Sequence, residues 1–209
     1  MPVSFAALFV GLLLSTVVSA QSANNPEATQ LRRVSGRVLT STVLPPIRIK
    51  FDKVLKYVGS QRFVLYGRAQ VEQHFFVNAD KQQRIKRMYM TQFEGYLPNI
   101  DARYDYPLTK TVNLGGQTYI VDAEVIPNVP AALKQNPQSD VARAASFLES
   151  KGYRIPESIV FQRFVRLVDE AKSNEFILLY VEAAGADASA ENEKQEFSKR
   201  ALKGFTIIK

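Results

Sequence analysis

The stretch that decides the fold runs from Arg62 to Leu97 and reads RFVLYGRAQVEQHFFV (62–77), NADKQQ (78–83) and RIKRMYMTQFEGYL (84–97). In the first run the odd positions are apolar except for Gln73, and most even positions are polar. A period of two is typical of a β-strand with one face in a core and the other toward water or a ligand. A polar turn and a second β-rich run follow, so the pattern predicts a long antiparallel hairpin.

Further strands and two helices are predicted on the C-terminal side of this hairpin. Gly115 and Gly116 indicate a tight turn into a strand over 117–126. Ser139 can cap a helix that ends near Gly152. The remaining predictions are strands over 159–168 and 175–183, a surface helix over 187–203, and a short strand or docked tail over 205–208.

The segment before the hairpin is less regular. Residues 31–46 contain β-branched residues but are interrupted by glycine and proline, so they are expected to form a short edge strand or an ordered arm. Residues 47–51 alternate as in a strand, whereas the apolar residues of 51–58 are spaced as on one face of a helix. Both interpretations stay open for 51–58, and a strand that leads into a short helical turn near Gly59 combines them.

The order of these elements predicts the α+β class. Short turns between neighbouring strands favour one curved antiparallel sheet of five or six strands, with an internal helix and a C-terminal helix packed against it. The strand over 175–183 is apolar on both faces, so we expect it at the centre of the sheet with helices as cover. The expected organisation is a signal peptide over 1–20, a flexible leader and arm over 21–46, and a single α+β domain over 47–209.

The N-terminal twenty residues predict export. They have no charged side chain and an apolar run that ends in small residues before Gln21, which is the pattern of a signal peptide cleaved after Ala20. An uncleaved membrane anchor is the alternative, although the run is shorter than the roughly 20 residues that span a bilayer. The chain has no cysteine and no Asn-x-Ser/Thr sequon, which fits a periplasmic or secreted bacterial protein.

Positive charge is concentrated in the first half of the expected mature chain. The net charge is +7, and residues 21–98 hold thirteen Lys and Arg against five Asp and Glu. Such an excess favours an anionic envelope surface, either lipid or polymer, as a partner. The charges are spread along the sequence, so a solvated protein without a particular partner explains them as well, and specific nucleic-acid binding is not expected.

Few catalytic chemistries remain open. A chain without cysteine cannot form a disulfide, a zinc-thiolate or iron–sulfur site, or a thiol nucleophile. His74 is the single histidine, and it shares a strand face with Glu72, so a His74–Glu72 pair is possible. An exposed strand histidine is the simpler interpretation, because no Gly-x-Ser-x-Gly element accompanies it. Glu94 and Glu72 form a second candidate, an acid/base dyad across the hairpin, against the commoner case of solvated glutamates.

Metal and cofactor sites are not expected. Asn99, Asp101 and Asp105 have spacings that partly match a calcium-binding loop. The match fails because Arg103 occupies a ligand position and Lys110 stands where the bidentate glutamate belongs. Residues 98–107 are therefore expected to be a loop across one end of the sheet.

An aromatic group near this loop is the most suggestive functional feature. Tyrosines at the end of a sheet can line an apolar pocket and orient a ligand with their hydroxyls, although ordinary core packing explains aromatic residues in strands equally well. The candidate ligand-binding residues are Tyr89, Phe93, Tyr96, Tyr104 and Tyr106.

Three functional hypotheses follow from the sequence. The first is a binding protein for a small amphipathic ligand or an envelope partner. The second is a hydrolase that uses His74 with a carboxylate. The third is an envelope-associated protein that binds anionic lipid or polymer. The scarcity of catalytic residues favours binding over catalysis.

Overall fold

The computed structural model describes residues 31–107, 110–185 and 191–208. The predicted signal peptide, its cleavage point and the first part of the leader lie outside the described residues. Residues 31–209 form one compact unit. Among the described residues, no helix has the length and apolar character needed to cross a membrane.

Two antiparallel sheets make up most of this unit. The large sheet has the strand order β4-β5-β6-β10-β9-β8-β7, and the small sheet has the order β1-β2-β3-β11. The strands of the large sheet are β4 (Lys56–Leu65), β5 (Ala69–Ala79), β6 (Ile85–Tyr96), β7 (Thr111–Leu114), β8 (Gln117–Ile126), β9 (Ile159–Leu167) and β10 (Asn174–Ala183). Those of the small sheet are β1 (Arg32–Ser35), β2 (Val38–Ser41), β3 (Ile47–Phe51) and β11 (Phe205–Ile208).

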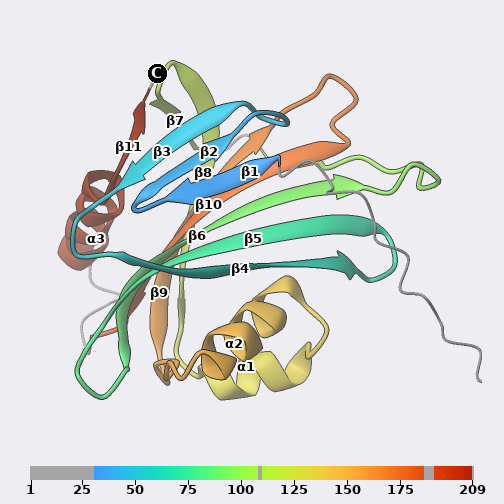
Figure 1. Ribbon diagram of the computed structural model, residues 1–209. Coiled ribbons are helices and arrows are strands. Elements are labelled where there is room, and N and C mark those ends of the chain that lie inside the picture. Colours follow the sequence, from blue (N-terminus) through green and yellow to red (C-terminus); the bar gives the residue numbers. More distant parts are fainter. Residues whose placement is uncertain (1–30, 108–109, 186–190, 209) are drawn as a thin grey trace, which may run out of the picture. The chain divides into compact units, whose positions relative to one another are not determined.

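The described helices cover the two faces of the large sheet unequally. They are α1 (Val129–Gln135), α2 (Asp140–Ser150) and α3 (Glu191–Lys203). Figure 1 shows α1 and α2 on one side of β4, β5 and β6, with the small sheet on the opposite side. One apolar core lies between the two sheets and includes Phe51, Phe76 and Phe197. A second core lies between the large sheet and the helices and includes Phe75, Met90 and Leu148.

This architecture agrees with the predicted α+β class, but the number of sheets and strands differs from the prediction. The chain is built from antiparallel strands with separate helices, as predicted, but it has sheets of four and seven strands instead of one sheet of five or six. The curvature of the sheet stays a prediction. Residues 31–46, expected as an edge strand or an ordered arm, contribute β1 and β2 to the small sheet.

The long strand expected over 62–77 is in fact two strands. The chain reverses at Tyr66 and Gly67, whose φ angles are 50° and 68°, so that Leu65 pairs with Ala69. Glycine adopts such positive φ values without the steric cost of a Cβ, and Gly67 was the signal for this turn. The decisive stretch therefore forms a three-stranded meander, with β5 paired to both β4 and β6.

The face of β5 that was expected to meet water or a ligand is covered. Glu72 is 6% exposed and His74 is 2% exposed, because the small sheet packs over them. The prediction of an exposed strand histidine is therefore wrong. Period-two alternation identifies the two faces of a strand, but it does not show which other element covers the polar face.

Two local predictions before and after the meander also need correction. The expected helical turn over 51–58 is absent, since β3 ends at Phe51 and β4 begins at Lys56 after a short turn. The proline-rich segment after β8, where no helix was predicted, contains the short helix α1, in which Asn128 accepts a hydrogen bond from the Ala131 N–H. Proline is favoured in the first turn of a helix, and Pro130 occupies such a position.

Several other predictions are confirmed. The glycine turn, the strand over 117–126 and the α2 helix lie where the sequence placed them, and the Ser139 hydroxyl accepts a hydrogen bond from the Ala142 N–H. Strand β10 is central and covered on both faces, but the cover on one face is the small sheet with α3 instead of helices alone. The last residues form strand β11, which pairs with β3.

Candidate functional site

A cavity lies between the large sheet and the helices α1 and α2. Its volume is about 190 Å³, and most of its lining is apolar. The sheet contributes Met88 and Met90 from β6 and Ile177 and Leu179 from β10. The helix contributes small side chains, among them Ala144.

The alanines of α2 explain why space remains at this place. Ala144 and Ala145 are buried and face the sheet, where longer side chains would fill the gap. Val141 also lines the cavity, but it is 44% exposed and lies where the cavity meets the surface. The helix is held in place by its cap and by buried Leu148, so the cavity belongs to the packed arrangement of helix and sheet.

One end of the cavity is polar. Gln92, Asp140 and Arg163 line it there, and Gln92 belongs to a row of glutamines in register across three strands. Gln61 Nε2 donates to Gln73 Oε1 at 2.7 Å, and Gln73 Nε2 donates to Gln92 Oε1 at 2.6 Å. Gln73 and Gln92 are fully buried, so these hydrogen bonds satisfy amides that would otherwise be costly to bury.

The glutamine row ends on carboxylates. Gln92 Nε2 donates to Glu94 Oε2 at 2.7 Å and to Asp140 Oδ2 at 3.0 Å. Glu175 on β10 is directly opposite Glu94 on β6 in the sheet register. Residues paired in this way have Cβ atoms about 4.5–5.5 Å apart on the same face. Three acidic side chains, from β6, β10 and the start of α2, therefore meet at the polar end.

Two tyrosines of the loop over 98–107 cover these carboxylates. The Tyr104 hydroxyl donates to Glu94 Oε1 at 2.9 Å, and the Tyr106 hydroxyl donates to Glu175 Oε2 at 2.7 Å. The Tyr104 ring also stacks on Tyr96 with centroids 4.5 Å apart. The loop thus contributes neutral hydrogen-bond donors to the site and no positive charge.

The environment favours the protonated form of these glutamates. Burial raises the pKa of Glu175 to about 7; the Tyr106 hydrogen bond opposes this shift, and the charge of Glu94 adds to it. Burial also raises the pKa of Glu94, against the hydrogen bonds from Tyr104 and Gln92. A carboxyl group whose pKa lies near neutrality is a feature that functional sites share.

The positive charge near these carboxylates belongs to Arg163, which is paired with a different acidic residue. Arg163 forms an ion pair with Asp122, with Nη2 and Oδ2 2.5 Å apart. Within the described part of the chain, no arginine or lysine forms an ion pair with Glu94, Asp140 or Glu175. The polar end therefore has an excess of acidic groups.

Metal binding gains no support. In the described ranges, no three His, Asp or Glu side chains are grouped so that they could hold a metal ion. Asp101 and Asp105, from the sequence that partly matched a calcium loop, are exposed.

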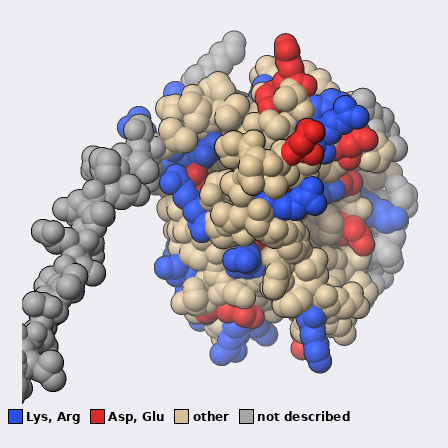
Figure 2. Space-filling view, turned by 90° about the vertical axis from the view of Figure 1, so that its right-hand side faces the viewer, with Lys and Arg blue, Asp and Glu red and all other residues tan. Residues whose placement is uncertain are grey.

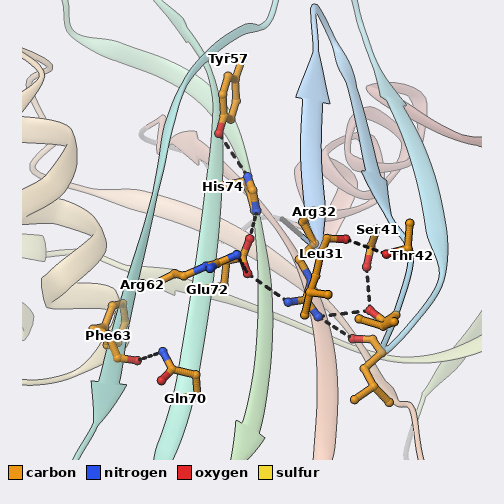
Figure 3. Close-up of polar contacts among 12 residues, drawn as sticks. Leu31, Arg32, Ser41, Thr42, Tyr57, Arg62, Phe63, Gln70, Glu72 and His74 are labelled. Carbon is orange, nitrogen blue, oxygen red and sulfur yellow. Dashed lines mark hydrogen bonds and ion pairs between the residues drawn. The ribbon is translucent and has the colours of Figure 1, made fainter. Parts of the chain in front are cut away.

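A second buried carboxylate, Glu72, lies on the other face of the large sheet. Figure 3 shows it between His74 and two arginines from different strands. Its Oε1 is 2.8 Å from His74 Nε2, and its Oε2 is 3.0 Å from an Nη atom of both Arg32 and Arg62. The His74–Glu72 pair that the sequence allowed is therefore present, and His74 Nδ1 also lies 3.2 Å from the Tyr57 hydroxyl.

The electrostatics of Glu72 are opposite to those of Glu175. Burial alone would raise the pKa of Glu72, but the His74 hydrogen bond and the positive charge of Arg32 hold the pKa below its usual range. Glu72 pairs in register with Phe93, so it faces the small sheet, whereas Glu94 faces the helices. The proposed Glu72–Glu94 dyad is therefore wrong, because successive side chains of a strand point to opposite faces.

The aromatic group is divided between the same two faces. Tyr89 and Phe93 lie in the core between the two sheets, and the Tyr89 hydroxyl donates to the Ala201 carbonyl of α3. Tyr96, Tyr104 and Tyr106 gather at the carboxylate end of the helix face. Tyr104 and Tyr106 thus contact the carboxylates beside the cavity, whereas Tyr89 and Phe93 have the core-packing role that was the alternative interpretation.

Several residues of the site were not predicted from the sequence: Gln92, Asp140, Arg163 and Glu175. One signal was available, since Gln73 is the polar exception among the apolar positions of its run. Glu175 gave a similar signal, because it directly precedes the most apolar run of the chain, and the structure shows it only 3% exposed. The link between Glu175 and Glu94 requires the pairing of β6 with β10, which their distance in sequence conceals.

The surface offers no comparable feature on the face drawn in Figure 2. There the Lys and Arg side chains are scattered among acidic and uncharged residues and do not form one patch. No family model, curated protein or solved structure matches the chain.

Proposed function

We propose that this protein is an exported domain that binds a small amphipathic ligand between its large sheet and helices α1 and α2. The apolar part of the ligand would lie against the methionine, isoleucine and alanine side chains of the cavity, and its polar head at the carboxylate end. The observation that carries this proposal is an apolar cavity that ends on a buried cluster of hydrogen-bonding groups. Pockets with this composition are typical of small-molecule sites.

The size of the cavity limits the ligand. An engineered apolar cavity of about 150 Å³ in another protein holds benzene, and the cavity described here is about 190 Å³. A six-carbon chain with one polar head is therefore a suitable probe. The natural ligand is expected to place a group of about this size inside, with any longer part leaving past Val141.

The hydrolase hypothesis receives less support from the geometry. The His74–Glu72 pair lies under the small sheet, on the face opposite the cavity, and both side chains are buried. The arginines and Tyr57 already contact this pair, so its hydrogen-bonding atoms are used within the protein. A cluster of this kind holds the two sheets together.

The direct test measures binding of 1-hexanol to the full chain by heteronuclear NMR. We expect saturable shifts of signals from Ile177 and Ala144, which lie on opposite walls of the cavity. The variant Ala144→Leu should abolish these shifts by filling the space. Ser146→Leu is the matched control, because it adds the same side chain to the exposed side of α2.

Two results would contradict the proposal. One is the absence of saturable binding by the wild-type protein. The other is equal binding by Ala144→Leu, with its fold confirmed by its NMR spectrum and its melting temperature. Mass spectrometry of a solvent extract from protein purified without denaturant then gives the identity of any natural ligand.

A further inference from the structure

We propose that the polar head of the ligand is a protonated amine, held at the cavity end between Glu94, Asp140 and Glu175. This inference rests on the proposed function, since it requires that a ligand occupy the cavity. It goes further by assigning the chemical class of the head group.

Charge complementarity selects a cation. Asp140 lines the polar end of the cavity, and Glu94 and Glu175 lie behind it, joined to it through Gln92 and the strand register. Within the described residues the one cation that lines the cavity, Arg163, is paired with Asp122. An anionic head would add a like charge to this cluster, and a neutral head would leave it uncompensated. An ammonium group supplies the missing positive charge.

The hydrogen-bonding capacity of the site also fits an ammonium group. Glu94 accepts one bond at each oxygen, from Tyr104 and Gln92, and Glu175 accepts one from Tyr106. An ionised carboxylate has about four acceptor positions, so both glutamates can accept more bonds. An ammonium group has three N–H donors and no acceptor. The hydroxyl and amide donors of Tyr104, Tyr106 and Gln92 are thus already used, while acceptor positions remain on the glutamates.

The position of these groups connects the carboxylates to the wall of the cavity. Asp140 and Gln92 line the cavity itself, and Gln92 links Asp140 to Glu94. Two N–H groups at the start of α2 are occupied by side-chain oxygens of Ser139 and Asp140. The helix start therefore has less capacity for an anionic head group than its position suggests.

Amine binding should depend on pH because Glu175 must lose its proton to act as a counter-ion. The groups that face Glu175 are Glu94 on β6, Arg163 on β9, Asp140 on α2, and Tyr104 and Tyr106 on the loop, with Asp122 behind Arg163. Because the pKa of Glu175 is about 7, this side chain is protonated in most protein molecules in mildly acidic solution. An alkylamine stays charged throughout this range, since its pKa resembles the value of about 10.4 for lysine.

The test compares three probes that share one apolar chain: hexylamine, 1-hexanol and hexanoate. At pH 8 we expect hexylamine to bind the wild-type protein about tenfold to a hundredfold more tightly than 1-hexanol, as charged hydrogen bonds imply, and hexanoate to bind most weakly. Between pH 7 and pH 5 the affinity for hexylamine should fall by up to about tenfold per pH unit, because a proton must then be released. The affinity for 1-hexanol should stay constant.

A matched pair of variants assigns the effect to the site. Glu175→Gln keeps the shape of the side chain and should weaken hexylamine binding and reduce its pH dependence, with Glu94 and Asp140 as the remaining acidic groups. Glu149→Gln removes an exposed charge from α2 and should change neither affinity. Glu94→Gln should weaken hexylamine binding in the same direction as Glu175→Gln, which keeps the test informative if either variant is poorly folded.

The outcomes separate this inference from the proposed function. If none of the three probes binds, both fail. If 1-hexanol binds but hexylamine binds no more tightly, or hexanoate binds best, the cavity is a ligand site and the amine assignment is wrong. Retention of the full amine preference and its pH dependence by folded Glu175→Gln would also overturn the assignment.

Discussion

The two faces of the large sheet each bury a glutamate, and the surroundings of the two side chains differ in charge. Glu72, under the small sheet, is 6% exposed and contacts Arg32, Arg62 and His74. Glu175, under the helices, is 3% exposed and receives a hydrogen bond from Tyr106. Burial is similar at the two sites, so the partners decide that one pKa is lowered and the other is raised.

This difference separates a structural cluster from a candidate binding site. The compensated face has its charges balanced within the protein, and Arg32 joins β1 of the small sheet to β5 of the large sheet. Within the described residues, Glu94, Asp140 and Glu175 on the helix face form no ion pair with a lysine or arginine, and they lie next to an apolar cavity. Burial of an uncompensated carboxylate is costly for folding, and carboxyl groups with strongly perturbed pKa values cluster at functional sites.

The largest expected effect on stability is at Glu72, on the face of the large sheet that the small sheet covers. Glu72→Gln should lower the free energy of unfolding at pH 7 by about 3 kcal/mol, because it leaves the charge of buried Arg32 unbalanced. Urea unfolding measures this change, with exposed Glu149→Gln as a control that should stay within about 0.5 kcal/mol of the wild-type protein. A loss no larger than that of the control would show that the cluster does not hold the sheets together.

Glu175→Gln is expected to raise the free energy of unfolding at high pH, whereas Glu72→Gln lowers it. The folded-state pKa of Glu175 is about 7, above the ordinary value of 4.5, so its protonation stabilises the fold fully below 4.5 and this contribution is lost as the pH rises through 7. Glutamine does not titrate, so the variant should be more stable than the wild-type protein by about 3 kcal/mol at pH 8 and equally stable at pH 4. Urea unfolding at both pH values measures the difference.

A constant difference between Glu175→Gln and the wild-type protein from pH 4 to pH 8 would contradict this account. Glu72→Gln supplies the matched comparison. The depressed pKa of Glu72 stabilises the fold above 4.5, and this contribution is lost as the pH falls below that value.

The smallest predicted effect concerns the tyrosine hydroxyl on Glu175. Tyr106→Phe removes the donor at 2.7 Å and should cost about 1 kcal/mol, as is usual for a single hydrogen bond. Tyr66→Phe is the control, because that hydroxyl is exposed and its loss should change stability little. If both variants lost the same stability, the Tyr106 hydroxyl would have no particular role at the site.

The sequence predicted those parts of the molecule that depend on local patterns. The strand over 117–126 has clear alternation and a glycine turn before it, and α2 has a serine cap and an apolar stripe, so both were located correctly. The turn at Gly67 was missed because apolar residues continue in alternation on both sides of it. Local periodicity does not distinguish a continuous strand from two strands that keep the same phase across a turn.

The site itself was predictable only in part. Tyr104 and Tyr106 were identified from their loop position, and Glu94 was identified with the wrong partner. Its true partner, Glu175, lies far along the chain and is brought opposite Glu94 by the pairing of β6 with β10. Strand order within a sheet depends on tertiary packing, so single-sequence reasoning could name these carboxylates without joining them.

The most direct test of the central claim is a carbon-13 NMR titration of the glutamate carboxyl groups, with and without hexylamine. The account predicts that Glu175 titrates near 7 in the free protein, that Glu72 titrates below its ordinary range, and that hexylamine lowers the midpoint of Glu175 while leaving Glu72 unchanged. A Glu175 midpoint near 4.5 in the free protein, or one that saturating hexylamine does not move, would contradict it.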